Sequence, residues 1–102
     1  MKLKASEIIV AEEKITEYLL VRKIKNDKSY FLRKLGYTLE NYQDLIADIL
    51  QIAKTYDAVL SRSNEFGNLY SIQGHLRNTL VITIWMEQIS NNTYRFVTLY
   101  PA

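Results

Sequence analysis

The stretch LVITIWMEQISNNTYRFVTLYP, residues 80–101, decides the fold that the sequence predicts. Its first half alternates two sets of side chains, Leu80/Ile82/Ile84/Met86 and Val81/Thr83/Trp85/Glu87. Period-two alternation of this kind predicts a β-strand. Both sets are largely apolar, so we expect a central strand, with the Leu80/Ile82/Ile84/Met86 set in the core. Asn91 and Asn92 supply turn residues, and residues 94–100 return as a second strand that places Tyr94, Phe96, Thr98 and Tyr100 on one face.

The residues before this hairpin predict helices and then shorter strands. Apolar side chains recur at helical spacing in three segments, residues 11–20, 28–35 and 39–55. Tyr30, Phe31 and Leu35 are expected on the buried side of the second of these, and Thr38 is expected to cap the third. Strands are expected at residues 58–63 and 68–73, with Gly74 ending the latter. Ile8, Ile9 and Val10 are β-branched and favour a short edge strand.

This order of elements predicts an α+β fold in a single domain, residues 1–102. About three N-terminal helices, within residues 11–56, pack on one face of a roughly four-stranded antiparallel meander, residues 58–101. A chain of 102 residues suits one modest core.

Composition narrows the classes of function. The chain has one His and no Cys, and its acidic residues lack metal-ligand spacing, so neither a metal site nor another cofactor is expected. No phosphate-cradling glycine-rich loop is present, and a Ser-His-Asp hydrolase would have to use His75. No run is long enough to cross a membrane and no signal peptide is evident, so a cytoplasmic protein is expected.

Positive charge is concentrated in one short segment, although the net charge is only +2. Residues 22–34 hold six Lys or Arg side chains against one Asp. Such a cluster attracts a polyanion, and Arg22 and Lys25 are its candidate contacts to a substrate. A solvated helix surface is the alternative interpretation.

One reaction needs few special residues, namely metal-free RNA cleavage by attack of the ribose 2′-OH. RNA supplies the nucleophile, and the protein aligns it, neutralises the phosphorane and moves protons. Lys, Thr and Tyr side chains can stabilise the phosphorane. A single His excludes a pair of histidines as acid and base.

Three short motifs resemble an uncharacterised bacterial domain family that occurs alone and at the ends of polymorphic toxins. The motifs are a Lys before Tyr-Leu-Leu, a Lys before an aromatic and Leu-Gly-aromatic, and a Thr-x-Trp strand before Thr-x-Tyr-Pro. They comprise Lys14, Tyr18, Leu19 and Leu20; Lys28, Phe31, Leu35, Gly36 and Tyr37; and Thr83, Trp85, Thr98, Tyr100 and Pro101. The family in turn resembles the ribonuclease superfamily of barnase, EndoU, colicin-type and RelE-type toxins.

The resemblance implies an RNA-cleaving site in which helices precede a sheet with one open face. Carried over by position, Lys14, Lys28, Thr98 and Tyr100 are the candidate catalytic residues, and His75 departs from the pattern as an optional proton carrier. Trp85 and Arg95 are further candidates for contacting the substrate, Trp85 by stacking on bases. For each of these residues a purely structural role is the alternative.

Two functions remain open from the sequence. The first is a metal-independent endoribonuclease of the toxin type, either active or degenerate. The second is a non-enzymatic interaction module whose partner is a cognate antitoxin or immunity protein. A homodimer through an exposed edge strand at residues 58–63 is compatible with either function.

Overall fold

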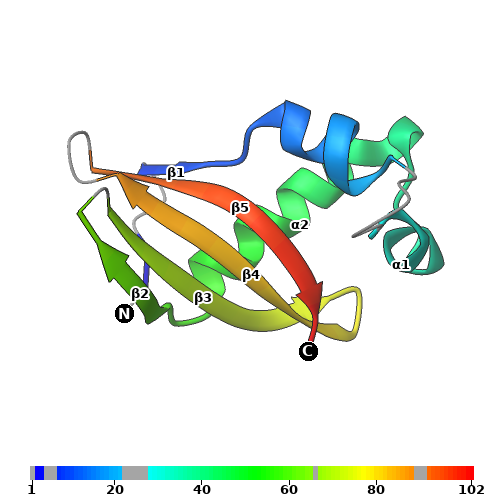
Figure 1. The fold of residues 1–102 in the computed structure, drawn as a ribbon. Helices are drawn as coiled ribbons and strands as arrows, with labels where there is room; N and C mark the ends of the chain where they lie inside the picture. The colour runs from blue at the N-terminus through cyan, green and yellow to red at the C-terminus, as the bar shows by residue number, and fades with distance from the viewer. Residues whose placement is uncertain (1, 4–6, 22–27, 66, 89–91) are drawn as a thin grey trace.

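The computed structural model describes residues 2–3, 7–21, 28–65, 67–88 and 92–102 (Figure 1). It combines a five-stranded sheet with short helical segments. In chain order the elements are β1 (Ile8–Ile9), η2 (Lys14–Leu19), α1 (Ser29–Lys34), η3 (Leu39–Asn41), α2 (Tyr42–Thr55), β2 (Val59–Asn64), β3 (Gly67–Leu76), β4 (Thr79–Gln88) and β5 (Thr93–Pro101).

The sheet has the strand order β1-β5-β4-β3-β2 and is mostly antiparallel. The predicted four-stranded meander is therefore present as β2 to β5. The edge strand predicted at Ile8, Ile9 and Val10 is confirmed as β1, which lies at one edge of the sheet. It pairs parallel with β5, Ile8 with Tyr94 and Ile9 with Arg95, so the sheet has five strands where about four were predicted.

Strand β3 is longer than predicted. It does not end at Gly74 but continues to Leu76. Gly74 has a packing role there. A β-carbon at this position would lie 2.7 Å from the ring of Tyr56, which packs directly against the glycine backbone. A glycine inside a strand often marks such a close approach.

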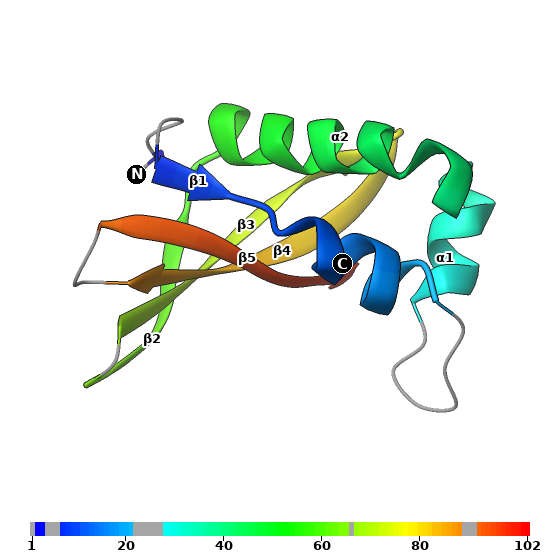
Figure 2. The same cartoon turned by 90° about the horizontal axis from the view of Figure 1, so that it is seen from above.

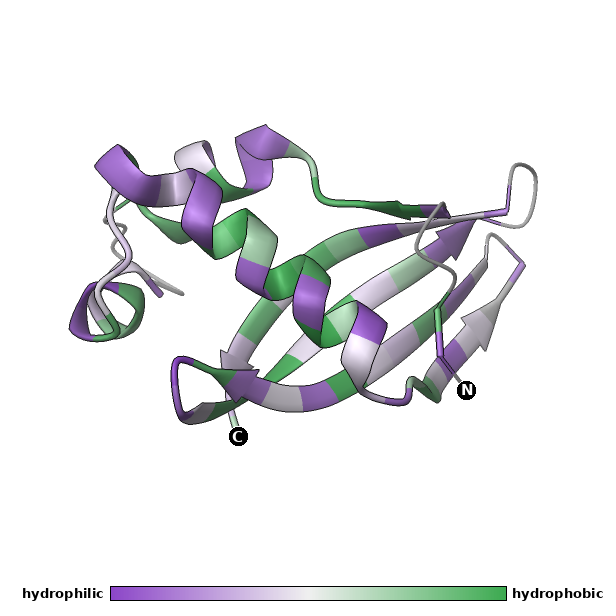
Figure 3. Cartoon of the chain, turned by 180° about the vertical axis from the view of Figure 1, so that it is seen from behind, coloured by the Kyte–Doolittle hydropathy of each residue, from purple (hydrophilic) through white to green (hydrophobic). Residues whose placement is uncertain are grey.

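Helix α2 covers one face of the sheet (Figures 2 and 3). It buries Leu45, Ile49, Ile52 and Ala53, which recur at helical spacing. The predicted cap is confirmed, because the Thr38 side chain accepts a hydrogen bond from the Glu40 N–H. The first residues of the predicted third helix form the 3₁₀ turn η3.

The face of β4 that lies under α2 is the opposite of the one predicted. Val81, Thr83 and Trp85 are fully buried, whereas Leu80 is exposed and Ile82 is only partly buried. Because both alternating sets of β4 are apolar, periodicity identifies the strand but not its buried side.

A β-bulge in β5 also changes the predicted pattern. The partner of Ile84 is Thr98 and the partner of Trp85 is Phe96, so Val97 is an extra residue. Phe96 consequently faces the core together with Trp85, while Thr98 and Tyr100 follow Ile84 and Ile82 to the other side. The expectation that Phe96 and Thr98 share a face was wrong because one inserted residue reverses the alternation.

The predicted buried side of the segment that forms helix α1 is confirmed for Phe31 and Leu35, which pack partly buried against the core, and is wrong for Tyr30. Leu32 is fully buried, whereas Tyr30 is 62% exposed and its ring lies 5.3 Å from the Lys34 Nζ. Gly36 follows the helix with φ of 94°, the left-handed conformation expected at a helix end.

Candidate functional site

The two faces of the sheet differ in burial and in charge. We call the side under α2 the covered face and the opposite side the open face. Alternation and strand register assign these described residues to the open face: Val59, Arg62, Leu69, Ser71, Gln73, His75, Leu80, Ile82, Ile84, Met86, Arg95, Thr98 and Tyr100. None of them is buried, and none is an Asp or Glu.

Lys28 reaches the open face from outside the sheet. It lies immediately before α1, which stands beside the end of the sheet where β5 terminates (Figures 1 and 2). The Lys28 Nζ donates a hydrogen bond to the Thr98 Oγ1 over 2.5 Å, although 70 positions separate the two residues. Two of the candidate catalytic residues are thus in direct contact.

Tyr100 lies on the same face, one row further along β5. Thr98 pairs with Ile84 and Tyr100 pairs with Ile82, so the two hydroxyl-bearing residues flank a partly buried isoleucine pair. Residues two apart on a strand have α-carbons about 7 Å apart. This spacing allows both hydroxyl groups to contact one phosphate or two successive phosphates.

Lys14 opens η2, which packs against α2 and β5. Its Nζ lies 5.6 Å from the centre of the Tyr18 ring, a cation–π contact within the same segment. The structure gives no contact between Lys14 and the Lys28–Thr98 pair within the described residues. Arg22 and Lys25 lie outside the described residues.

His75 and Trp85 are placed away from the Lys28–Thr98 pair. His75 is exposed and pairs with Leu80, four residues along β4 from the partner of Thr98. Strand spacing and rise put the His75 and Thr98 α-carbons roughly 16 Å apart, too far for both side chains to contact one phosphate. Trp85 is fully buried on the covered face, where its Nε1–H donates to the Thr83 Oγ1 over 2.8 Å, so its ring is not available for stacking on a base.

Two arginines add positive charge to the open face one row beyond Thr98, on the side away from Tyr100. Arg95 is exposed, pairs with Met86 and donates through Nε to the Gln88 Oε1 over 3.2 Å. Arg62 pairs with Leu69 and is also exposed. Sequence periodicity does not select Arg62, because a register shift between Leu60 and Arg62 interrupts the alternation of β2.

The covered face carries a polar cluster at the same end of the sheet. The Tyr94 hydroxyl donates to the Glu87 Oε2 over 3.1 Å, and the Asn68 amide donates to the Glu87 Oε1 over 2.7 Å. Burial, followed by the hydrogen bond to Glu87, raises the pKa of Tyr94 to about 12. The Glu87 carboxylate is therefore held on the side away from the open face.

A second cluster fastens the turn between β3 and β4 to the helices. The Arg77 guanidinium lies 4.1 Å from the centre of the Tyr37 ring and donates to the Leu35 carbonyl over 3.0 Å. The Tyr37 hydroxyl donates to the Asp48 Oδ2 over 2.5 Å. Burial and the adjacent Asp48 carboxylate raise the pKa of Tyr37 above its ordinary range, and Arg77 opposes this shift.

Two further geometric findings concern the described part of the chain. No three His, Asp or Glu side chains lie close enough together there to hold a metal ion. None of the helices in those ranges has the length and apolar character needed to span a bilayer.

Fold and site together define a small α+β domain with an open sheet face, whose described strand positions carry Arg62 and Arg95 and hold no Asp or Glu. Residues 2–102 match the model of a family described as a domain of unknown function (DUF6883), so the chain belongs to that family. Searches found no significant match among curated proteins or among solved structures.

Proposed function

We propose that this domain is a metal-independent endoribonuclease that binds RNA on the open face and cleaves it by transesterification at the 2′-OH. The observation that carries the proposal is the contact between the Lys28 ammonium and the Thr98 hydroxyl. It lies on a sheet face whose described strand positions hold no carboxylate. A phosphodiester placed there meets a cation and a hydroxyl group without facing a carboxylate from those strands.

Lys28 and Thr98 have complementary roles in this reaction. The 2′-oxygen attacks phosphorus, the bond from phosphorus to the 5′-oxygen breaks, and the products carry a 2′,3′-cyclic phosphate and a 5′-OH. Negative charge grows on the non-bridging oxygens of the phosphorane. The Lys28 ammonium neutralises that charge and the Thr98 hydroxyl donates a hydrogen bond to it.

Proton transfer falls to a group close to this pair. The proton of the 2′-OH passes to a solvent water, and another proton is delivered to the departing 5′-oxygen. Tyr100 presents the next hydroxyl group on the same face, and we assign the delivery of the second proton to it. His75 lies too far along the sheet to act on the same phosphate, so we give it no part in this step.

The remaining basic residues of the open face extend the proposed RNA path. Arg62 and Arg95 lie one row beyond the Ser71/Ile84/Thr98 row, on the side away from Tyr100. They would bind phosphates next to the one that is cleaved. Ile82, Ile84 and Met86 of β4 are partly buried on the same face, and they would provide an apolar surface for unstacked bases.

Incubation of purified protein with single-stranded RNA in excess EDTA tests the proposal. We expect cleavage products with cyclic phosphate ends. Lys28→Ala should lower the rate by about 100-fold and Thr98→Val by about tenfold. Lys54→Ala is the matched control, because Lys54 is an exposed lysine on α2 that lies away from the open face. Loss of activity in EDTA, or full activity of Lys28→Ala, would rule the mechanism out.

A non-enzymatic interaction module is the second candidate, and the apolar residues of the open face favour it. Leu80 is 38% exposed and lies next to Ile82 on β4, and Val59 is 63% exposed and lies in the same row as Ile84 with Ser71 between them. An antitoxin or immunity protein could cover this surface. Wild-type protein that fails to bind or cleave RNA under any of these conditions would support this second candidate over the first.

A further inference from the structure

Strand β3 has a length of edge that β2 does not cover. β2 pairs with β3 from Asn64 opposite Gly67 to Val59 opposite Ser71. β3 continues for five more residues, Ile72 to Leu76, which pair only with β4 in the described sheet. Its outer edge is therefore open over the last half of the strand.

The hairpin geometry identifies which backbone groups point outward there. Arg77 and Asn78 form a two-residue turn with φ of 50° and 68°, the pattern of a type I′ turn. Leu76 and Thr79 close this turn as a hydrogen-bonded pair, and alternate pairs along the ladder, including Ile72 with Thr83, are bonded in the same way. The intervening residues, Gln73 and His75, thus direct their N–H and C=O groups away from β4.

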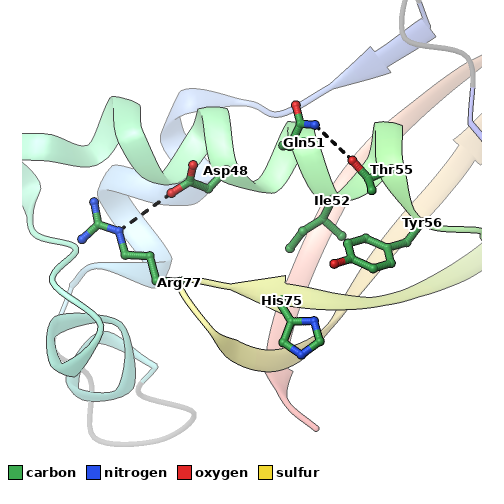
Figure 4. Close-up of a pocket in the computed structure, with 7 residues that line it drawn as sticks. All are labelled: Asp48, Gln51, Ile52, Thr55, Tyr56, His75 and Arg77. Atoms are coloured by element: carbon green, nitrogen blue, oxygen red, sulfur yellow. Dashed lines mark hydrogen bonds and ion pairs between the residues drawn. The ribbon is translucent and has the colours of Figure 1, made fainter.

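A groove runs beside this edge and is bounded on its other side by the last turns of α2 (Figure 4). Its volume is about 440 Å³. Ile52 and Tyr56 give it an apolar wall, and the Tyr56 ring packs on Gly74 within β3. Arg77 and Asp48 close one end through their ion pair of 3.9 Å.

This edge lacks the features that normally prevent strand pairing. Proline, lysine and inward-pointing charges are the usual protections, and residues 72–76 contain none of them. Gln73 and His75 are exposed, and His75 is the only ionisable side chain of the segment. An exposed donor–acceptor row beside an apolar groove matches the way in which extended peptides are bound by strand addition.

We propose that the edge of β3 at Gln73 and His75 binds a short extended segment of a partner polypeptide as an additional β-strand. Main-chain hydrogen bonds to these two residues hold the segment, and an apolar side chain of the segment packs against Ile52 and Tyr56 in the groove. The site uses the outer backbone edge of β3 and the groove beside α2, not the Lys28–Thr98 pair, so it does not depend on ribonuclease activity.

The test uses a capped pentapeptide of alternating threonine and valine with a central phenylalanine as the probe. Titrated into ¹⁵N-labelled protein, it should shift the amide signals of Gln73 and His75 and slow the hydrogen exchange of both amides. The Gln73→Pro variant removes an outward N–H without removing a bond to β4, so affinity should fall by about tenfold. Gln73→Ala keeps that N–H and should bind as the wild type does.

A second measurement keeps the test independent of how Gln73→Pro folds. Two further peptides are titrated into the wild type. One is N-methylated at its odd-numbered amides and the other at its even-numbered amides. One of the two should lose binding because its methyl groups block the paired edge. Equal binding of both methylated peptides, no binding of the parent peptide, or shifts confined to Thr98 and Tyr100 would overturn the proposal. So would protection of the Gln73 and His75 amides that rises with protein concentration alone, since a second copy would then be the occupant.

Discussion

The two faces of the sheet are built from the same four long strands but are put to different uses. On the covered face Thr83, Trp85 and Leu99 are fully buried, and their polar atoms are hydrogen-bonded within the protein. On the open face Thr98 contacts Lys28, and no side chain of the described strands is buried. Burial on one side stabilises the fold, and the other side is left available for recognition.

The largest difference in stability between variants of the two faces should appear at two neighbouring residues of β4. Trp85→Ala removes a fully buried side chain that packs edge-on against Phe96 at 5.5 Å between ring centres. We expect it to lower the free energy of unfolding by about 3–5 kcal/mol. Ile84→Ala, on the open face one residue away, should cost about 1 kcal/mol. Urea denaturation of both variants measures this difference, and equal losses would contradict the assignment of faces.

Two threonines allow a comparison with smaller effects. Thr83 donates to the Ile72 carbonyl over 3.1 Å and accepts from the Trp85 Nε1–H. Thr83→Val leaves the buried Trp85 Nε1–H without its acceptor and removes a second donor from the Ile72 carbonyl, so stability should fall by about 1–3 kcal/mol. Thr98→Val on the open face should change stability by at most about 0.5 kcal/mol, because water replaces the lost contact. Thermal denaturation of the pair would refute this account if Thr98→Val were the more destabilising.

Alkaline pH should weaken the covered face through Tyr94. Its pKa is raised from 10.0 to about 12, so the folded state keeps the phenolic proton where the unfolded state loses it. This contribution is complete below pH 10 and is lost as the pH rises toward about 12. Denaturation midpoints measured across this range should fall less steeply in Tyr94→Phe than in the wild type. Identical slopes would exclude the Tyr94–Glu87 contact as a source of stability.

The sequence predicted the helices and strands more accurately than it predicted which side of each strand is buried. The third predicted helix and the final hairpin are present because their apolar periods are long and regular. The buried side of β4 could not be read from two apolar sets, and one extra residue at Val97 reversed the orientation of the last residues of β5. The β-branched residues 8–10 predicted the edge strand β1 but not its parallel partner, since Tyr94 lies 86 positions beyond Ile8.

The candidate site could be predicted only in part. Lys28 and Thr98 were selected because they match a family pattern, and no local rule connects residues so far apart in the chain. Their contact exists because α1 stands at the end of β5 and the bulge turns Thr98 outward. Trp85 was proposed to stack on bases, but its size and apolar character suit the core equally well and it is buried there. The roles of Lys28 and Thr98 in RNA cleavage stay predictions.

The central claim is that RNA binds on the open face of the sheet. Isoleucine methyl NMR tests it most directly, because isoleucines lie on both faces. Ile82 and Ile84 lie on the open face, while Ile49 and Ile52 of α2 and Ile72 of β3 lie in the core between the helix and the sheet. Titration with a short single-stranded RNA should shift the Ile82 and Ile84 methyl signals and leave the three core signals in place. The shifts should weaken strongly in Lys28→Ala and with added salt. RNA binding that leaves the Ile82 and Ile84 signals unmoved would contradict the account.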